Sequence, residues 1–189
     1  DTEKKLQGME SDTFIITCLR FATACGFTAR TRFDLVLNDF VADAVLNGEI
    51  NILSDGSPWR PLINTKDMAR AANWALSRDI KNGGAFCITN VGSNNWNYQV
   101  KDLAFAVADI ISGTKVSINK DAQPDKRSYK VNFTKFNELA PDHQPKETLE
   151  STIQELKDGI LNMDLKDKNF RDSNYIRLNV LRNHINSDR

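Results

Sequence analysis

The chain alternates short apolar, β-rich runs with longer segments in which apolar residues recur every three or four positions. The extended runs are residues 13–24, 50–53, 85–92, 115–119 and 128–133. The segments with helical spacing are residues 2–8, 34–48, 65–75, 97–111, 134–140, 146–161 and 174–185. Strands that alternate with helices are typical of an α/β protein with at least some parallel sheet. Residues 13–24 contain no proline and are almost entirely apolar, so we expect a central strand covered on both faces.

One stretch, "SDGSPWRPLINTKD" at residues 54–67, combines a turn with an aromatic residue and a guanidinium. The dipeptide Asp55-Gly56 and the following Pro58 predict the turn, and Trp59 and Arg60 stand directly after it. Thr65 is then expected to cap the helix that follows.

Composition excludes several classes of partner. Lys and Arg together number 25, as do Asp and Glu, so no net charge attracts nucleic acid or an anionic membrane. No apolar run approaches the roughly 20 residues of a membrane span. No signal peptide is visible at the start, so we expect a cytoplasmic protein in which Cys18, Cys25 and Cys87 are small buried thiols. Two histidines supply no plausible zinc ligand set, and a Cys–His nucleophile pair stays open without a supporting motif.

Four motifs follow one another in an order that is specific. They read "LRFATACG" (19–26), "SDGSPWRPLINTKDMARA" (54–71), "FCITNVGSNN" (86–95) and "PDKRSYKVNFTKF" (124–136). Together they resemble the second half of the extended short-chain dehydrogenase/reductases, the NAD-dependent nucleotide-sugar epimerase/dehydratase family. The resemblance implies the C-terminal part of a Rossmann-like parallel sheet interleaved with a small mixed α/β substrate-binding lobe over residues 1–163. Residues 164–189 would be a helical tail extension.

The resemblance also implies roles for two arginines. Arg60 matches the family arginine near the diphosphate of the nucleotide sugar, and Arg127 matches a second arginine that reaches the nucleotide or its phosphates. A guanidinium offers phosphate oxygens a planar fork of donors, which suits both positions. Two other interpretations stay open: Arg60 could stack on Trp59 as a surface cation–π pair, and Arg127 could be a solvated loop residue.

Further substrate and cofactor positions come from the same resemblance. Thr23 stands where the family usually has an asparagine beside the sugar phosphate, and Asn38 stands where it often has a polar contact to substrate. A plain solvated helix residue is the other interpretation of Asn38. Phe21 and Ala22 match positions whose backbone faces the nicotinamide. Asn64 and Asn132 depart from the usual histidine or tyrosine and the usual aspartate.

The family's cofactor loop and catalytic pair do not stand out in this sequence. Its nine glycines form no G-x-G-x-x-G or G-x-x-G-x-x-G turn. The family base is a tyrosine with a lysine four residues later, whereas Asp102, Phe133 and Asn179 follow the three tyrosines at that distance. We therefore expect no catalytic residue here. Glu3 matches a residue of the helix after the family lysine, so we expect a fragment that begins just past it.

The leading hypothesis is the substrate-binding half of an NAD-dependent nucleotide-sugar epimerase/dehydratase, inactive alone. NAD would belong to the complete enzyme and would not bind this chain by itself. The expected partners are a nucleotide-diphosphate sugar and either a missing N-terminal half or another chain that completes the sheet, and a homodimer is also open. The alternative is a non-catalytic nucleotide- or protein-binding module derived from the same fold. Epimerase, dehydratase and reductase chemistry are not distinguished.

Overall fold

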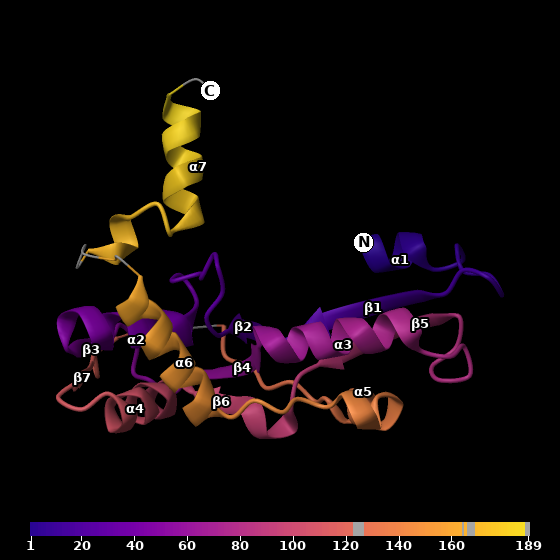
Figure 1. Ribbon diagram of the computed structural model, residues 1–189, viewed down its shortest axis with the longest axis horizontal. Coiled ribbons are helices and arrows are strands. Elements are labelled where there is room, and N and C mark those ends of the chain that lie inside the picture. Colours follow the sequence, from indigo (N-terminus) through magenta and orange to yellow (C-terminus); the bar gives the residue numbers. More distant parts are fainter. Residues whose placement is uncertain (123–126, 164, 166–168, 188–189) are drawn as a thin grey trace. The chain divides into compact units, whose positions relative to one another are not determined.

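The computed structural model describes residues 1–122, 127–163, 165 and 169–187. The fold is α/β with parallel strand pairing, as the sequence predicted (Figure 1). The chain divides into two compact units. The first unit is Asp1–Ala24, Pro61–Asn97 and Lys130–Lys146, and the second unit is Cys25–Arg60, Tyr98–Tyr129 and Glu147–Arg189. The predicted boundary at 163/164 stays a prediction.

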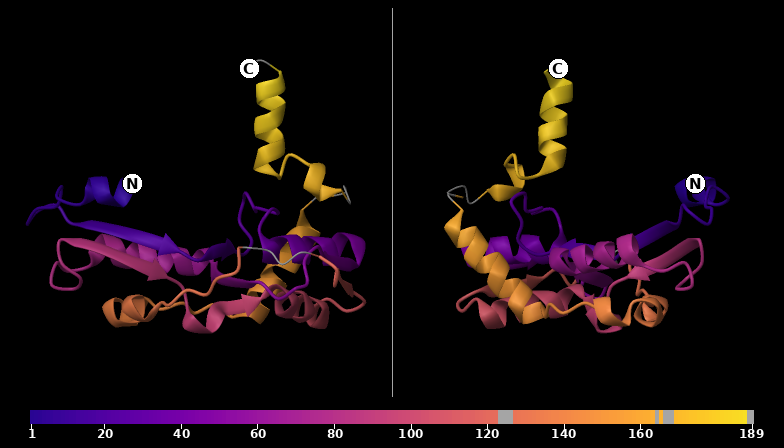
Figure 2. Two further views of the ribbon diagram at one scale, coloured as in Figure 1. Left: turned by 180° about the vertical axis from the view of Figure 1, so that it is seen from behind. Right: turned by 45° about the vertical axis from the view of Figure 1, so that its right-hand side comes forward.

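The first unit is built on a parallel pair of strands. Strand β1 (Ile16–Phe21) pairs with β5 (Phe86–Val91) over its whole length, from Ile16 opposite Phe86 to Phe21 opposite Val91 (Figure 2). Helix α3 (Thr65–Ser77) packs against β1, and α5 (Thr134–Leu139) packs against β5. Three shorter helices complete this unit: α1 (Thr2–Leu6), η1 (Asn94–Trp96) and η2 (Pro141–His143).

The core of the first unit lies between these helices and strands. Its fully buried members are Ile63, Ala71, Trp74, Cys87, Val91, Phe136 and Ala140. The rings of Trp74 and Phe136 meet edge to face with centroids 5.6 Å apart, a favourable geometry for aromatic quadrupoles. Cys25 and Cys87 are buried and Cys18 is half-buried. Burial raises the pKa of the Cys18 thiol.

The described residues do not show the central strand predicted at 13–24. Among the described residues β1 belongs to a two-stranded sheet and pairs with β5 alone. The run is also divided, because β1 ends at Phe21 and a separate strand β2 (Thr23–Cys25) follows. An apolar run indicates that the faces of a strand are buried. The number of strands that pair with it depends on which other segments reach its edges.

Strands β2, β4 (Trp59–Asn64) and β6 (Asn97–Gln99) form a three-stranded sheet in the order β2-β4-β6. Each of these strands contains a boundary between the two units of the chain.

Two predicted helix starts differ in the structure. Asn64, not Thr65, caps α3, since its side chain accepts a hydrogen bond from Lys66 N at 2.8 Å. The helix expected over 97–111 begins only at Val100, because residues 97–99 are strand β6.

The second unit packs helices α2 (Val36–Asn47) and α4 (Val100–Ile110) against another parallel pair, and α6 (Leu149–Asn162) packs on these two helices. Strand β3 (Glu49–Ile52) pairs with β7 (Lys115–Ile118), and β3 alternates exposed with buried residues so that Ile50 and Ile52 face the core. Helices α2 and α4 also contact each other. Helix α2 ends as predicted at Gly48, whose φ of 68° is left-handed.

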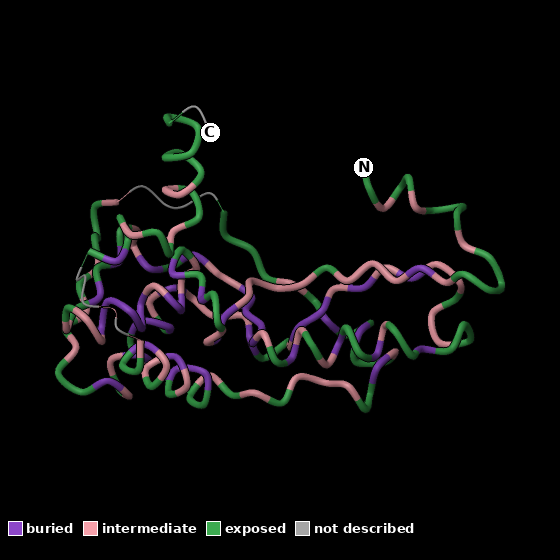
Figure 3. Tube along the Cα trace, turned by 45° about the horizontal axis from the view of Figure 1, so that its top comes forward, coloured by how far each residue is buried: buried purple, intermediate pink, exposed green. Residues whose placement is uncertain are grey.

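The tail of the second unit contains η3 (Phe170–Asp172) and α7 (Arg177–Asn186). Phe170 is fully buried, but α7 has no buried residue, as the exposed and half-buried colouring along it in Figure 3 shows. The tail therefore attaches to the second unit through the segment before α7. Within the described chain, no helix combines the length and the hydrophobicity needed to cross a membrane.

Replacing Gly159 with Ala in α6 is expected to lower the free energy of unfolding by about 1–2 kcal/mol. An added Cβ would lie 2.3 Å from Cδ2 of Phe27, which is closer than real contacts allow, so the ring must move. The clash outweighs the gain in helix propensity. Chemical denaturation measures the loss, and a second change, Phe27→Leu in the Gly159→Ala background, should recover part of it. A Gly159→Ala variant more stable than the parent would contradict this contact.

Candidate functional site

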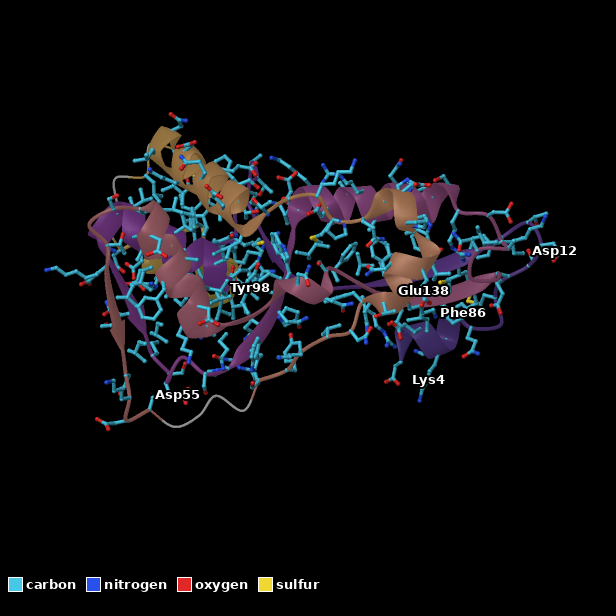
Figure 4. The ribbon with its side chains drawn as sticks, turned by 90° about the horizontal axis from the view of Figure 1, so that it is seen from below. Lys4, Asp12, Asp55, Phe86, Tyr98 and Glu138 are labelled. Carbon is cyan, nitrogen blue, oxygen red and sulfur yellow. The ribbon has the colours of Figure 1, made fainter. Side chains whose placement is uncertain are left out.

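The turn before Trp59 is held firmly within the second unit. Asp55, labelled in Figure 4, accepts hydrogen bonds from Ser57 N at 3.1 Å and from Ser57 Oγ at 2.8 Å. The Ser57 side chain thereby lowers the pKa of Asp55. Lys101 N donates to the Gly56 carbonyl at 3.0 Å, and an added Cβ on Gly56 would lie 2.8 Å from Lys101 Cβ. The turn thus rests on the first residues of α4 and gives Trp59 and Arg60 a fixed starting point.

Arg60 and Arg127 come together although they are 67 residues apart in sequence. Arg60 Nη1 donates to the Arg127 carbonyl and, at 2.8 Å, to the Trp59 carbonyl. Two further hydrogen bonds reinforce this, from Trp59 N to the Ser128 side-chain Oγ at 3.1 Å and from Tyr129 N to the Trp59 carbonyl at 3.4 Å. Arg60 is half-buried and Arg127 is exposed. The Arg60 guanidinium therefore holds the backbone that presents Arg127.

Residues 124–126 of the fourth motif lie outside the described residues. The rest of the motif is hydrogen-bonded to asparagines that its sequence pattern does not indicate. Asn94 Oδ1 accepts from Phe133 N at 2.9 Å, and Asn97 Oδ1 accepts from Val131 N at 2.9 Å. Asn97 Nδ2 also donates to the Val131 carbonyl at 3.1 Å. These side chains act as strand partners for residues 131–133. The only sequence signal was the cluster of asparagines after β5, which resembles an ordinary turn.

Asn38 lies at the start of α2 and is 2% exposed, so its interpretation as a solvated helix residue is wrong. Its Oδ1 accepts from Gly26 N at 3.1 Å, and its Nδ2 donates to the Arg32 carbonyl at 3.0 Å. The side-chain amide thereby closes the loop between β2 and α2. Thr31 tightens this loop further, because its Oγ1 accepts from Thr28 N at 2.9 Å. A substrate contact by Asn38 stays a prediction.

Phe21 and Ala22 lie where β1 ends in the first unit. Phe21 stands opposite Val91, and Ala22 N donates to the Val91 carbonyl at 3.0 Å. Thr23 follows, half-buried, at the start of β2. The residue after β5, Gly92, must be glycine for packing, since an added Cβ would lie 2.7 Å from the Phe133 ring. Ligands of α/β sheets commonly bind beyond the carboxyl ends of parallel strands, and these residues occupy that end of the β1–β5 pair.

The predicted site residues therefore fall into two groups. The first unit carries Phe21, Ala22 and Thr23, and the second unit carries Asn38, Arg60 and Arg127. Only the pair Arg60 and Arg127 is joined by a contact that sequence spacing does not suggest. Among the residues with described positions, no group of three His, Cys, Asp or Glu side chains is placed to hold a metal ion.

Part of the chain matches the model of a known protein family. Residues 6–92 match the model of the NAD dependent epimerase/dehydratase family. This segment belongs to that family. It contains the first two motifs, Phe21, Ala22, Thr23, Asn38 and Arg60. Arg127 lies beyond the matched epimerase/dehydratase segment.

Solved structures support the same fold over a larger part of the chain. One is an NAD dependent NDP-hexosamine 5,6-dehydratase involved in tunicamycin biosynthesis, with 16% identity, a TM-score of 0.65, and coverage of 79% of this chain and 46% of that one. Another is the Helicobacter pylori ADP-L-glycero-D-manno-heptose-6-epimerase, with 15% identity, a TM-score of 0.64 and coverage of 85% and 48%. A third is the Bacillus cereus UDP-N-acetylglucosamine 4-epimerase, with 18% identity, a TM-score of 0.62 and coverage of 78% and 49%. The chain thus spans about half the length of these structures, and the likeness establishes the fold.

Proposed function

We propose that this chain is the substrate-binding half of an NAD-dependent nucleotide-sugar epimerase/dehydratase, in which Arg60 and Arg127 bind the diphosphate. The observation that carries the proposal is the hydrogen bond from Arg60 Nη1 to the Arg127 carbonyl. It brings two cationic residues from distant parts of the sequence into one place, on a turn that is fixed by its contacts to α4. A diphosphate carries enough charge and enough acceptor oxygens to engage two guanidiniums.

The other site residues have supporting roles in this proposal. Thr23 offers a hydroxyl to the sugar phosphate, and Asn38 orders the loop beside the substrate through Gly26 and Arg32. Phe21 and Ala22 present their backbone to the nicotinamide of NAD, which is bound in the complete enzyme. This chain's residues bind and orient the substrate, while the cofactor turn and the tyrosine base come from another segment.

The edge of β1 is the place where that other segment joins in this proposal. Within the described residues β1 has β5 as its ladder partner on one side. A parallel pair normally lies inside a larger sheet, and the related structures are about twice as long as this chain. A strand from an N-terminal half, or from another chain, completes the sheet at this edge.

Arg60→Ala and Arg127→Ala are each expected to weaken nucleoside diphosphate binding by at least about tenfold, because a charge-assisted contact contributes roughly 2–4 kcal/mol when partly shielded from water. The measurement is isothermal titration of UDP, GDP, CDP and dTDP into the chain supplied with a cofactor-binding half. Arg182→Ala, an exposed arginine on α7, is the matched control and should bind like the parent. Parental affinity in both variants would rule out the diphosphate role.

The chain alone is expected not to bind NAD with micromolar affinity, since its sequence shows no glycine-rich cofactor turn. Titration of NAD into the 189-residue chain tests this, and a stoichiometric micromolar isotherm would overturn it. The same preparations test the non-catalytic alternative. A chain that binds a nucleoside diphosphate through both arginines, yet gives no turnover with any cofactor-binding half, would favour a nucleotide-binding module.

A further inference from the structure

The loop between β2 and α2 in the second unit is held from two sides. On one side the Asn38 amide binds Gly26 N and the Arg32 carbonyl. On the other side the loop inserts Phe33, which is fully buried, among aromatic residues of the tail. The Phe33 ring meets the rings of Phe170 and Tyr175 edge to face, each with a centroid distance of 5.6 Å. The tail is thus part of the packing that determines this loop's conformation.

An arginine in the same tail segment fixes that packing to α2. Arg171 Nε and Nη2 donate to the two carboxylate oxygens of Asp39, each at 2.8 Å, and Nη2 also donates to Asp43 Oδ2 at 2.8 Å. Its guanidinium carbon lies 4.7 Å from the centroid of the Phe170 ring, within the range of a cation–π contact. One side chain therefore neutralises two carboxylates on α2 and covers the aromatic contact beneath it.

The two carboxylates on α2 need the Arg171 guanidinium as their cationic partner. Asp43 is 2% exposed, and Asp39 stands one helical turn before it. Burial raises the pKa of Asp39, and the hydrogen bonds from Arg171 oppose that shift. Removal of Arg171 would leave two neighbouring carboxylates without this cation, at the helix that also carries Asn38.

We infer that Phe170 and Arg171 are positioning residues, and that the tail segment 170–175 clasps the loop of residues 26–34 in the conformation that receives the sugar of the substrate. The inference rests on the proposed function for its ligand. The clasp acts through Phe33 and α2, so it touches no diphosphate oxygen itself. In this inference the tail contributes to sugar recognition, whereas Arg60 and Arg127 determine affinity for the diphosphate.

The first test needs no ligand. Hydrogen exchange is measured on the 189-residue chain and on its Arg171→Ala and Phe170→Leu variants. Amides of residues 26–34 should exchange at least about tenfold faster in both variants. Arg182→Ala, an exposed arginine on α7 of the same tail, should leave them unchanged. If Arg171→Ala and Phe170→Leu exchange like the parent in this loop, the clasp does not exist. Arg171→Lys provides the same test, with a smaller expected effect, if either substitution prevents folding.

The second test separates the sugar from the diphosphate. With a cofactor-binding half supplied, affinities are compared for UDP and UDP-glucose, GDP and GDP-mannose, and dTDP and dTDP-glucose. Arg171→Ala should reduce the affinity gained from the sugar by about tenfold while affinity for the nucleoside diphosphate stays within about twofold, and Arg171→Lys should restore part of the loss. A loosened loop with an unchanged sugar contribution would overturn the positioning role. If no probe binds the parent, the proposed function fails, and the exchange experiment still decides whether the clasp exists.

Discussion

Replacing Arg78 with Met is expected to lower the free energy of unfolding by about 3–5 kcal/mol. Arg78 follows α3 in the first unit and is 5% exposed. Its guanidinium donates to Thr17 Oγ1 at 2.7 Å and to the carbonyls of Gly84 at 2.8 Å, Asn82 at 3.0 Å and Ile16 at 3.1 Å. Methionine fills much of the volume but supplies no donor, so buried carbonyls lose their partner. Because the free energy of unfolding of most domains is only about 5–15 kcal/mol, this loss is a large fraction of the stability.

Urea denaturation followed by circular dichroism measures this loss. Arg30→Met, which makes the same substitution in an exposed loop, should change stability by less than about 0.5 kcal/mol. Arg78→Lys should recover only part of the loss, because an ammonium on a flexible chain cannot reproduce the planar fork that reaches four acceptors. A loss below about 1 kcal/mol in Arg78→Met would show that these carbonyls find other partners.

Replacing Phe136 with Ala is expected to cost about 3–5 kcal/mol. Phe136 is fully buried on α5, contacts the Trp74 ring edge to face, and joins α5 to α3 across the core of the first unit. Truncation leaves a cavity between two helices whose backbones are held by other contacts, so the space cannot close completely. It also removes the ring that covers Trp74, whose buried Nε1 has no hydrogen-bond partner in the described structure.

The matched control for this core substitution is Phe105→Ala on α4, where the phenylalanine is 48% exposed. We expect a loss of less than about 1 kcal/mol there, because the ring is already partly in water. Equal losses at the two positions would show that burial in the first unit does not determine the effect. Phe136→Leu should fall between the parent and Phe136→Ala, since it keeps most of the apolar volume.

Helix and strand positions were largely predictable because their signals are local. The spacing of Leu37, Phe40, Val41 and Ala44 predicts α2, and Gly48, which is left-handed, ends it. The expected helix over 146–161 is α6 at Leu149–Asn162. A predicted helix start is wrong where two neighbouring residues are both suitable N-caps. Asn64 and Thr65 are both good caps, and only the backbone geometry selects Asn64.

The site was predictable only in its residue types. The motifs pointed to Arg60 and Arg127, but nothing in their local sequence indicated that one side chain would bind the other's backbone. The sequence favours a substrate contact or a solvated position for Asn38, whereas its amide is hydrogen-bonded within the loop. The sequence predicts a helix at 174–185, but no local pattern indicates the contacts of Phe170 and Arg171 before it.

By itself the sequence determined the α/β class, the order of its helices and strands, and the motifs that resemble a known family. These depend on periodicity, turn residues and short motifs, each of which acts over a few neighbouring positions. Only the tertiary structure decided that β1 pairs with β5, that Arg60 supports Arg127, and that Arg171 joins the tail to α2. Those contacts join residues that are far apart in the chain, and their free energy depends on burial and hydrogen-bond geometry that no local pattern encodes.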